Sequence, residues 1–481
     1  MFFIGPVRVG TIHDWVPSSG SVVSWHPSPA ARVKAAEAPI SSVPPSYMQA
    51  QHLHGYADQV AKGLDYSRLL IATCDVAGQC DIRAMTYIIN THLRRHDTYR
   101  SWFEYDDTKN DAKNLVRHTI ADSAAIEFVP TDRGTMTLPD LHDRVLATPD
   151  PFQWDCFSFG IVQGDDHFSF YTSVDHLHMD ATFAIVMVSE FHMMYAALVG
   201  GGPPVPLPDA GSYDEFCLRQ HREVSTLTVE SPQVRTWIEF GENNNKSLPV
   251  FPLPLGDPSK PCSGAILTQQ LLDEQQVARF ESACVAAGAR FSGGVFACAA
   301  LTEHEITRTP TYYGLTPSDT RSTPTDFVTL GWFTGMIPIT VPVAGASFGD
   351  TARVAQSCFD AGTDLANVPW DRVVELAPWL NRPPPNFPVI NYIDGGVAPF
   401  SGVFSSLLEG LNLGIWFDGR YSYQFCVFVN RMENETAMTV LFPDNPVARE
   451  SVTRYLQVMR SWYVRVADGQ DAIALNNADR A

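Results

Sequence analysis

One change of pattern near the middle of the chain limits its fold more than any other feature. Residues 168–174 alternate apolar and polar side chains, as a half-buried strand does. Residues 181–198 form a long apolar run with few helix breakers, which predicts a buried helix. Residues 175–181 (DHLHMDA) therefore lie in a turn between a strand and a helix. Side chains in such a turn are held by rigid elements and can still open into a cleft.

On its own residues, this turn has three interpretations. In the first, Asp180 is an ordinary helix N-cap and His176 is a hydrogen-bonded histidine at a strand end. In the second, His176 is a general base. In the third, His176, His178 and Asp180 bind a metal, because H-x-H-x-D opens the zinc motif of metallo-β-lactamase-like hydrolases. That motif continues with another histidine, where this chain has Ala181, and it lies much nearer the start of those chains.

Length and composition set broad bounds on fold and partners. A chain of 481 residues is long for one hydrophobic core, so we expect two subdomains. A formal net charge of −20 argues against a nucleic-acid partner, which would require a basic face. The nine cysteines are odd in number and scattered, without any C-x-x-C pair. We therefore expect neither a disulfide framework nor structural zinc.

The N-terminus and the apolar runs bear on location. Residues 1–6 (MFFIGP) lack the basic region and the long apolar run of a signal peptide. The run at 181–198 is interrupted by Ser189, Glu190 and His192, so it is not predicted to span a membrane. With the cysteine pattern, this predicts a cytoplasmic protein, either free or at the inner face of the plasma membrane.

A stretch rich in glycine and proline predicts where the chain divides into two subdomains. Residues 200–211 are the strongest run of turn formers. We place the boundary there, with an N-terminal subdomain over residues 1–205 and a C-terminal subdomain over residues 206–481. Residues 213–240 are predicted to be helical. Both halves mix helices and strands, so the predicted class is α+β, with a ligand cleft between the halves.

Five short stretches, in chain order, match the motifs of one family. Residues 45–51 (PSYMQAQ) contain Ser-x-x-Gln, residues 95–103 (RHDTYRSWF) resemble RHExLRTxF, and residues 175–181 resemble HHxxxDG. Residues 331–338 (GWFTGMIP) resemble IGxFVNTLP, and residues 368–373 (VPWDRV) resemble a PFE-type segment. The chain thus resembles the chloramphenicol-acetyltransferase-like superfamily that includes peptide-synthetase condensation domains. Within it, the chain is most similar to the mycobacterial polyketide-associated acyltransferases of trehalose.

The resemblance covers about residues 1–465 and implies two chloramphenicol-acetyltransferase-like subdomains with mixed sheets and an active-site channel between them. It implies transfer of a long-chain acyl group from acyl-CoA to a hydroxyl of trehalose or a trehalose derivative, in glycolipid synthesis for the mycobacterial cell envelope. A carrier-protein thioester is the alternative donor and a polyketide synthase a candidate partner. No cofactor is implied beyond acyl-CoA as cosubstrate, and we expect a monomer. Segments 312–317 and 385–391 look most like the family member that makes diacyltrehalose.

The family pattern assigns roles to the residues of the turn. His176 corresponds to the general base, and Asp180 to a carboxylate that supports or orients the turn. A neutral imidazole within reach of a hydroxyl can take its proton during attack, which contributes about 10²–10⁴-fold to the rate. Arg321 is predicted to be the ionic partner of Asp180, and the alternative is a solvated turn residue. Two positions depart from HHxxxDG, because Asp175 replaces the first histidine and Ala181 replaces the glycine.

Four further residues are candidates for a substrate channel, each with an ordinary structural alternative: His178, Trp332, Trp370 and Arg321. The chain has no DFGWG, the second motif of the wider superfamily. Two rival functions remain. One is a hydrolase with zinc at His176, His178 and Asp180, and the other is a condensation-like binding module that has lost its chemistry.

Overall fold

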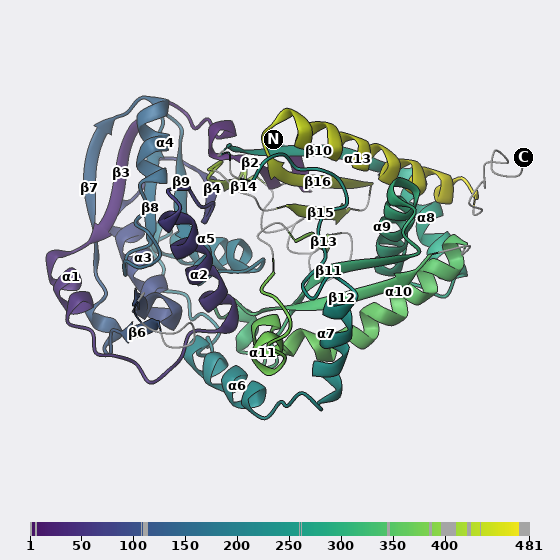
Figure 1. Ribbon diagram of the computed structural model, residues 1–481. Helices are drawn as coiled ribbons and strands as arrows, with labels where there is room; N and C mark the ends of the chain where they lie inside the picture. The colour runs from purple at the N-terminus through teal and green to yellow at the C-terminus, as the bar shows by residue number, and fades with distance from the viewer. Residues whose placement is uncertain are drawn as a thin grey trace, which may run out of the picture. The chain divides into compact units, whose positions relative to one another are not determined.

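The computed structural model describes residues 2–4, 7–106, 108, 114–258, 260, 262–343, 347–383, 387–395, 410–420, 425–432 and 434–470. The chain forms two compact units, neither of which is continuous in sequence (Figure 1). The first comprises Met1–Thr226, Thr320–Phe333 and Gly402–Arg420; the second comprises Leu227–Asp319, Thr334–Ser401 and Tyr421–Ala481. The chain first passes from one unit to the other after Thr226, beyond the glycine- and proline-rich stretch where the boundary was predicted.

An eight-stranded sheet forms the centre of the first unit (Figure 1), in the order β1-β2-β14-β4-β9-β8-β3-β7. The strand predicted before the turn at residues 175–181 (the central turn) is confirmed as β9, which lies between β4 and β8 and is antiparallel to both. Because it has a neighbour on each side, β9 is buried along almost its whole length. The strands are β1 (Phe2–Ile4), β2 (Val7–Thr11), β3 (Ser21–Pro27), β4 (Leu69–Ala77), β7 (Phe128–Thr135), β8 (Phe157–Gln163), β9 (His167–Asp175) and β14 (Gly414–Phe417).

Strand β14 reaches this sheet from late in the chain. It pairs in parallel with β2 and antiparallel with β4, so it closes the gap between two strands of the N-terminal region. Gly414 permits this approach, because a Cβ there would lie 2.5 Å from the Trp416 ring and 2.7 Å from the Thr73 hydroxyl. The eight-stranded sheet therefore depends on residues from both ends of the sequence.

Five of the six described helices of the first unit begin at a residue whose side chain caps the helix; α5 is the exception. The Asp81 carboxylate caps α3 by accepting hydrogen bonds from the Arg83 and Ala84 amides. The predicted buried helix after the turn is confirmed as α5, which buries Phe183, Met187 and other residues of one face. The helices are α1 (Pro29–Ala36), α2 (Tyr47–Ala61), α3 (Ile82–Arg95), α4 (Leu138–Leu146), α5 (Phe183–Val199) and α6 (Tyr213–Ser225), with a hairpin of β5 (Ser101–Tyr105) and β6 (Leu115–Thr119).

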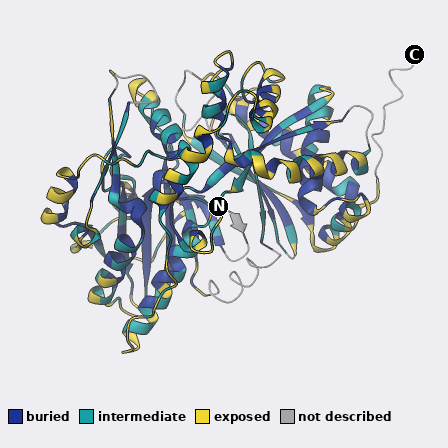
Figure 2. Cartoon of the chain, turned by 90° about the horizontal axis from the view of Figure 1, so that it is seen from below, coloured by how far each residue is buried: buried dark blue, intermediate teal, exposed yellow. Residues whose placement is uncertain are grey.

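The second unit has a six-stranded sheet in the order β10-β16-β15-β13-β11-β12. Its core lies between this sheet and helices such as α9 and α13, and Figure 2 shows the buried residues gathered along the strands. The strands are β10 (Gly264–Asp273), β11 (Thr311–Asp319), β12 (Thr334–Pro342), β13 (Val389–Asp394), β15 (Cys426–Arg431) and β16 (Glu435–Pro443). The helices are α7 (Pro232–Glu242), α8 (Glu274–Ala286), α9 (Phe291–Thr307), α10 (Phe348–Gly362), α11 (Trp370–Leu376) and α13 (Pro446–Ala467).

The region 213–240, predicted to be helical, is two helices and not one. Helix α6 ends at Ser225, and α7 begins at Pro232. Proline has no N–H to donate within a helix interior, but it fits well in a first turn, where that N–H would have no partner. The passage between the two compact units falls in this break.

Two further expectations concern cysteines and membrane spans. All nine cysteines are free thiols, as their odd number and scatter predicted. Within the described ranges, no single helix is both long and apolar enough to cross a membrane. Helices α8 and α9 meet these criteria only as a pair, and they are bent by 92° where they join.

Candidate active site

His176 directly follows β9 and begins the single 3₁₀ turn η4 (His176–His178) that leads towards α5. Its main-chain N–H donates to the Arg68 carbonyl oxygen over 2.8 Å, which ties the turn to the chain before β4. The ring is half-buried and packs on Trp332, with ring centroids 4.1 Å apart. Its Nδ1 is buried and bonds to no other described residue.

The surroundings of His176 favour its neutral form. Burial, followed by the neighbouring His52 ring, lowers its pKa from 6.5 to about 4. The carboxylates of Asp175 and Asp180 oppose this shift but do not overcome it. At neutral pH the imidazole is therefore unprotonated, which is the state that can accept a proton from a hydroxyl.

Asp180 is held from two sides by protein donors. Its Oδ1 accepts hydrogen bonds from the Thr182 amide at 3.0 Å and the Thr182 hydroxyl at 2.9 Å. Its Oδ2 accepts a bond from the Phe333 amide at 3.0 Å and pairs with Arg321 Nη1 at 2.8 Å. The predicted ion pair between Asp180 and Arg321 is confirmed. The carboxylate joins the start of α5 to the 320–333 segment of the same unit.

Arg321 supports this arrangement from the interior, and its predicted place on a substrate channel is wrong. Its side chain is only 1% exposed. Besides the pair with Asp180, its Nε donates to the Asp326 carbonyl oxygen and its Nη2 to that of Thr329. The guanidinium also lies 4.3 Å from the centre of the Phe333 ring. A head group held this fully by the protein has no donor to offer a substrate.

His178 is likewise a packed residue and does not line a channel, as the structural alternative anticipated. It has no exposed surface. Its Nδ1 bonds to the Thr98 hydroxyl at 3.0 Å and its Nε2 lies 3.2 Å from Cys156 Sγ. Burial lowers its pKa to about 4, so this ring too is neutral at neutral pH. Because the 3₁₀ turn ends the strand alternation, His178 does not share the direction of His176.

These contacts argue against the metal interpretation of the turn. Both nitrogens of His178 and both oxygens of Asp180 already have protein partners. Among the residues that the structure describes, the donor atoms of His176, His178 and Asp180 do not all lie within 4.8 Å of one another, as the ligands of one zinc ion would.

The two tryptophan candidates have different positions. Trp332 is half-buried and borders both the His176 ring and the His52 ring, so it belongs to the site. Trp370 belongs to the second unit, where it is 6% exposed and packs against Trp237. Its indole N–H donates to the Asn381 carbonyl oxygen. Trp370 is thus a core residue of that unit, as the ordinary structural alternative for it has it.

The sequence did not predict the buried network directly behind His176. Asp175 has no exposed surface, and its Oδ1 lies 2.7 Å from His52 Nε2. Its Oδ2 accepts a hydrogen bond from Arg68 Nη1 at 2.8 Å, and the Leu177 amide donates to Oδ1. Burial alone would raise the pKa of Asp175, but His52, Arg68 and the Leu177 amide outweigh it and lower the pKa to about 2. Asp175 is therefore ionised.

The Ser-x-x-Gln stretch links helix α2 to the turn. Ser46 and Gln49 form a capping box at the start of α2. The Gln49 side-chain amide also donates to the Leu177 carbonyl oxygen over 3.1 Å. His52 lies three residues further along this helix, one turn from Gln49. That spacing was the one local signal for His52 in the sequence.

The RHExLRTxF-like stretch contributes a second buried network and the one cluster of potential metal ligands among the described residues. Glu190 Oε2 lies 2.8 Å from His92 Nδ1 and 3.2 Å from His96 Nε2, and its Oε1 accepts a bond from Arg95 Nε. The remaining nitrogens bond to the Tyr99 hydroxyl and the Leu330 amide. Each donor atom is thus satisfied by the protein, and the cluster ties α3 to α5.

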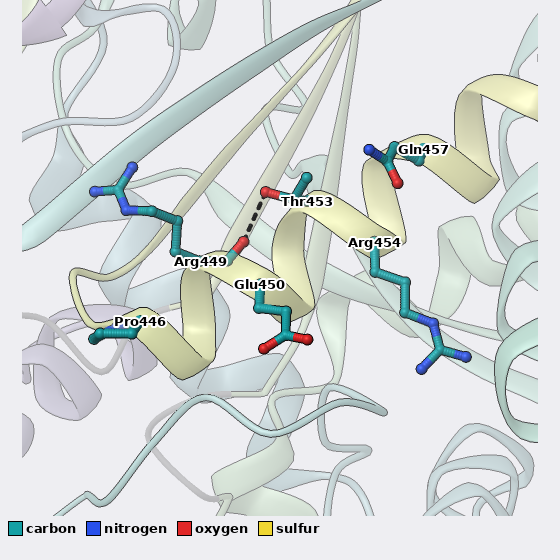
Figure 3. A pocket seen from close by; sticks show the side chains of 6 residues that line it. All are labelled: Pro446, Arg449, Glu450, Thr453, Arg454 and Gln457. Carbon is teal, nitrogen blue, oxygen red and sulfur yellow. Dashed lines mark hydrogen bonds between the residues drawn. The ribbon is translucent and has the colours of Figure 1, made fainter.

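A shallow depression of about 540 Å³ on α13 holds none of the predicted site residues (Figure 3). Its labelled side chains, among them Arg449, Glu450 and Arg454, project from one helix. The Thr453 hydroxyl there bonds only to the Arg449 carbonyl oxygen of the preceding turn. This is the exposed face of a helix and carries no constellation of reactive groups.

Comparison with known proteins decides the family. A family model described as the condensation domain matches residues 69–381, more than half of the chain. The chain belongs to the condensation-domain family. Solved condensation domains share its fold at low identity: the first condensation domain of the calcium-dependent antibiotic synthetase has a TM-score of 0.63 at 15% identity and covers 90% of this chain and 99% of its own.

Within the condensation-domain family, the relatives that match almost the whole chain are named acyltransferases. "Acyltransferase PapA3" of Mycobacterium tuberculosis is 61% identical over 97% of this chain and 98% of its own. "Trehalose-2-sulfate acyltransferase PapA2" of Mycobacterium bovis is 56% identical over 97% and 98%. The solved structure "PapA2 acyl transferase" has a TM-score of 0.91 at 55% identity and covers 96% of this chain and all of its own. This chain is likewise an acyltransferase, and its two sheet-containing subdomains are those of the family.

Proposed function

We propose that the chain transfers a long-chain acyl group from an acyl-CoA thioester to a hydroxyl of trehalose or a trehalose derivative, with His176 as general base. One observation carries the proposal: a half-buried imidazole at the end of a central strand whose Nδ1 is buried, so that Nε2 is the nitrogen we assign to the substrate. Relatives named as acyltransferases of sulfated trehalose support the acceptor class. The predicted channel between subdomains, the monomeric state and a polyketide synthase partner remain proposals.

The proposed transfer needs only this one acid–base group. A sugar hydroxyl is a weak nucleophile, and His176 Nε2 takes its proton as the oxygen attacks the thioester carbonyl carbon. A C–O bond forms, and the tetrahedral intermediate then breaks its C–S bond. The imidazolium, whose low pKa makes it a good acid, returns the proton to the departing thiolate. The imidazole is neutral again, and no acyl-enzyme has formed.

The acceptor class includes both trehalose and its sulfated derivatives. Two relatives are named for acting on 2'-acyl-2-O-sulfo-trehalose and on trehalose 2-sulfate. We therefore propose that the sulfated sugar and trehalose itself are the two acceptors to compare.

Product analysis tests this function. Purified protein is incubated with acyl-CoAs of several chain lengths, or in parallel with an acyl carrier-protein thioester, and with either trehalose or trehalose 2-sulfate, and the products are identified by mass spectrometry. We expect acyltrehalose together with an equal amount of free CoA thiol. CoA release that does not depend on the sugar would instead indicate a thioesterase. The absence of product with both donor classes, CoA and carrier protein, would indicate a binding module without catalytic activity.

A further inference from the structure

A buried Asp–His pair stands directly behind the proposed base. His52 comes from α2, Asp175 from the end of β9, and their contact of 2.7 Å bridges 123 residues of sequence. The side chain of His52 is 4% exposed and that of Asp175 is completely buried. Because Asp175 is ionised and accepts at Oδ1, His52 Nε2 carries the hydrogen of this bond. The hydrogen bond therefore fixes the orientation of the His52 ring.

The His52 ring lies against the groups of the site. Its centroid is 5.6 Å from that of Trp332, in an edge-on contact, and 6.3 Å from that of His176. Trp332 in turn packs on His176 at 4.1 Å. The three rings thus form one cluster, in which His52 alone is bonded to a fixed carboxylate.

Arg68 anchors the carboxylate of this pair. Its Nη1 donates to Asp175 Oδ2 and its Nη2 to the Thr148 carbonyl oxygen, and its side chain is 4% exposed. The Arg68 main-chain carbonyl also accepts the hydrogen bond from the His176 amide. One residue therefore holds both Asp175 and the backbone of His176.

We propose that the Asp175–His52 pair is a positioning device for His176: the carboxylate holds the His52 imidazole, and through Trp332 this ring holds the His176 imidazole in its reactive orientation. The inference rests on the proposed function, because it assumes that His176 is the base. It makes His52 a positioning residue, specific to a chain that has Asp175 where the family pattern has histidine.

Electrostatics at the site agree with this geometry. After burial, His52 is the largest cause that lowers the pKa of His176. Loss of the His52 imidazole should therefore raise the pKa of His176, towards 6.5. The other titratable or charged groups around the pair and His176 include Arg68, Tyr56, Tyr66, Cys156, His178, Asp180 and Arg321.

Three variants separate position from charge. His52→Leu removes both the bond to Asp175 and the imidazole, whereas His52→Gln can keep a donor near the place of Nε2 but carries no positive charge. The control is His54→Gln, on the same helix, where His54 Nε2 bonds to Asn114 Oδ1 away from the rings. Initial rates of CoA release are measured from pH 4 to 8 after dilution from a neutral stock, so that slow acid unfolding does not enter the profile.

We expect His52→Leu to lower kcat by about 10- to 100-fold with little change in KM, the scale of a small misplacement of a reacting group. His52→Gln should recover most of kcat, and in both variants the acid limb of the profile should move to higher pH. His54→Gln should match the wild type in both respects. A folded His52→Leu with wild-type kcat and an unmoved acid limb would overturn the inference, as would a loss of kcat that His52→Gln does not recover.

If His52→Leu does not fold, the acid limb of the His52→Gln profile decides, and an unmoved limb overturns the inference. Two further results keep this test separate from that of the proposed function. If His176→Ala retains wild-type activity, the proposed function fails. If His176→Ala is inactive while the folded His52 variants behave as wild type, only the role of His52 fails.

Discussion

The ion pair between Asp180 and Arg321 is a residue-scale feature with a large expected cost of removal. Both side chains are almost fully buried, at 4% and 1% exposed. Loss of one partner leaves a buried charge without compensation, so Asp180→Asn should lower the free energy of unfolding by about 3–5 kcal/mol. Urea denaturation measures this value. The exposed pair of Lys62 and Asp58 is the control, because Asp58→Asn should change it by less than about 1 kcal/mol. Equal, small effects of both variants would contradict a supporting role for Asp180.

Asp175 makes the stability of the protein depend on acid pH. Its pKa in the fold is about 2, below its ordinary value of 3.8. A carboxyl group whose pKa is lowered in the fold stabilises the fold at pH values above its ordinary pKa. This contribution, on the order of 2 kcal/mol, is lost as the pH falls from about 4 towards 2. We expect urea denaturation of Asp175→Asn to show lower stability at neutral pH but a smaller further loss over that interval. If the wild type and the variant lose the same stability over that pH interval, Asp175 does not titrate as described.

At this scale the sequence predicted some roles and missed others, for a physical reason. His176, Asp180 and the Asp180–Arg321 pair followed from a motif and its charge. The partnership of His52 with Asp175 has no local signature, because a bond across 123 residues is created only by the fold. The packing of His178 was also beyond the pattern, since the 3₁₀ turn replaces the strand period just where that residue lies.

The residues that cap helix α2 also hold the turn at residues 175–181 in place. The Ser46 side chain caps the helix at the Gln49 amide, and Gln49 reaches the Leu177 carbonyl oxygen. Ser46→Ala should lower the free energy of unfolding by about 1 kcal/mol and also lower kcat, because the start of α2 loosens behind the turn. Ser28→Ala removes the matching cap of α1, at Ala31, and should cost similar stability without changing kcat. Denaturation curves and steady-state rates distinguish the two, and equal kcat values would contradict the link.

Among the elements, those with local signals were predicted best. The alternation of β9 and the apolar run of α5 each need only neighbouring residues, and the structure confirms both. Strand β14 was not predicted, because its four residues gain their place from partners in β2 and β4, hundreds of positions earlier.

For the whole molecule, the discontinuous units predict how the chain can be divided. A fragment of residues 1–226 lacks β14, which lies between β2 and β4, and also lacks Arg321, the partner of Asp180. It would expose unpaired strand edges and leave a buried carboxylate without its cation. We expect no cooperative unfolding transition for this fragment by circular dichroism, whereas the full chain should show one. A cooperative transition in the fragment would show that the first unit does not need its later segments.

The whole account depends on proton transfer by one imidazole. The most direct test compares the wild type with His176→Ala in trehalose-dependent release of CoA from a long-chain acyl-CoA, with the free energies of unfolding measured alongside. We predict that kcat/KM falls about 10²–10⁴-fold while the variant remains folded. A folded His176→Ala protein with wild-type turnover would contradict the general-base role of His176.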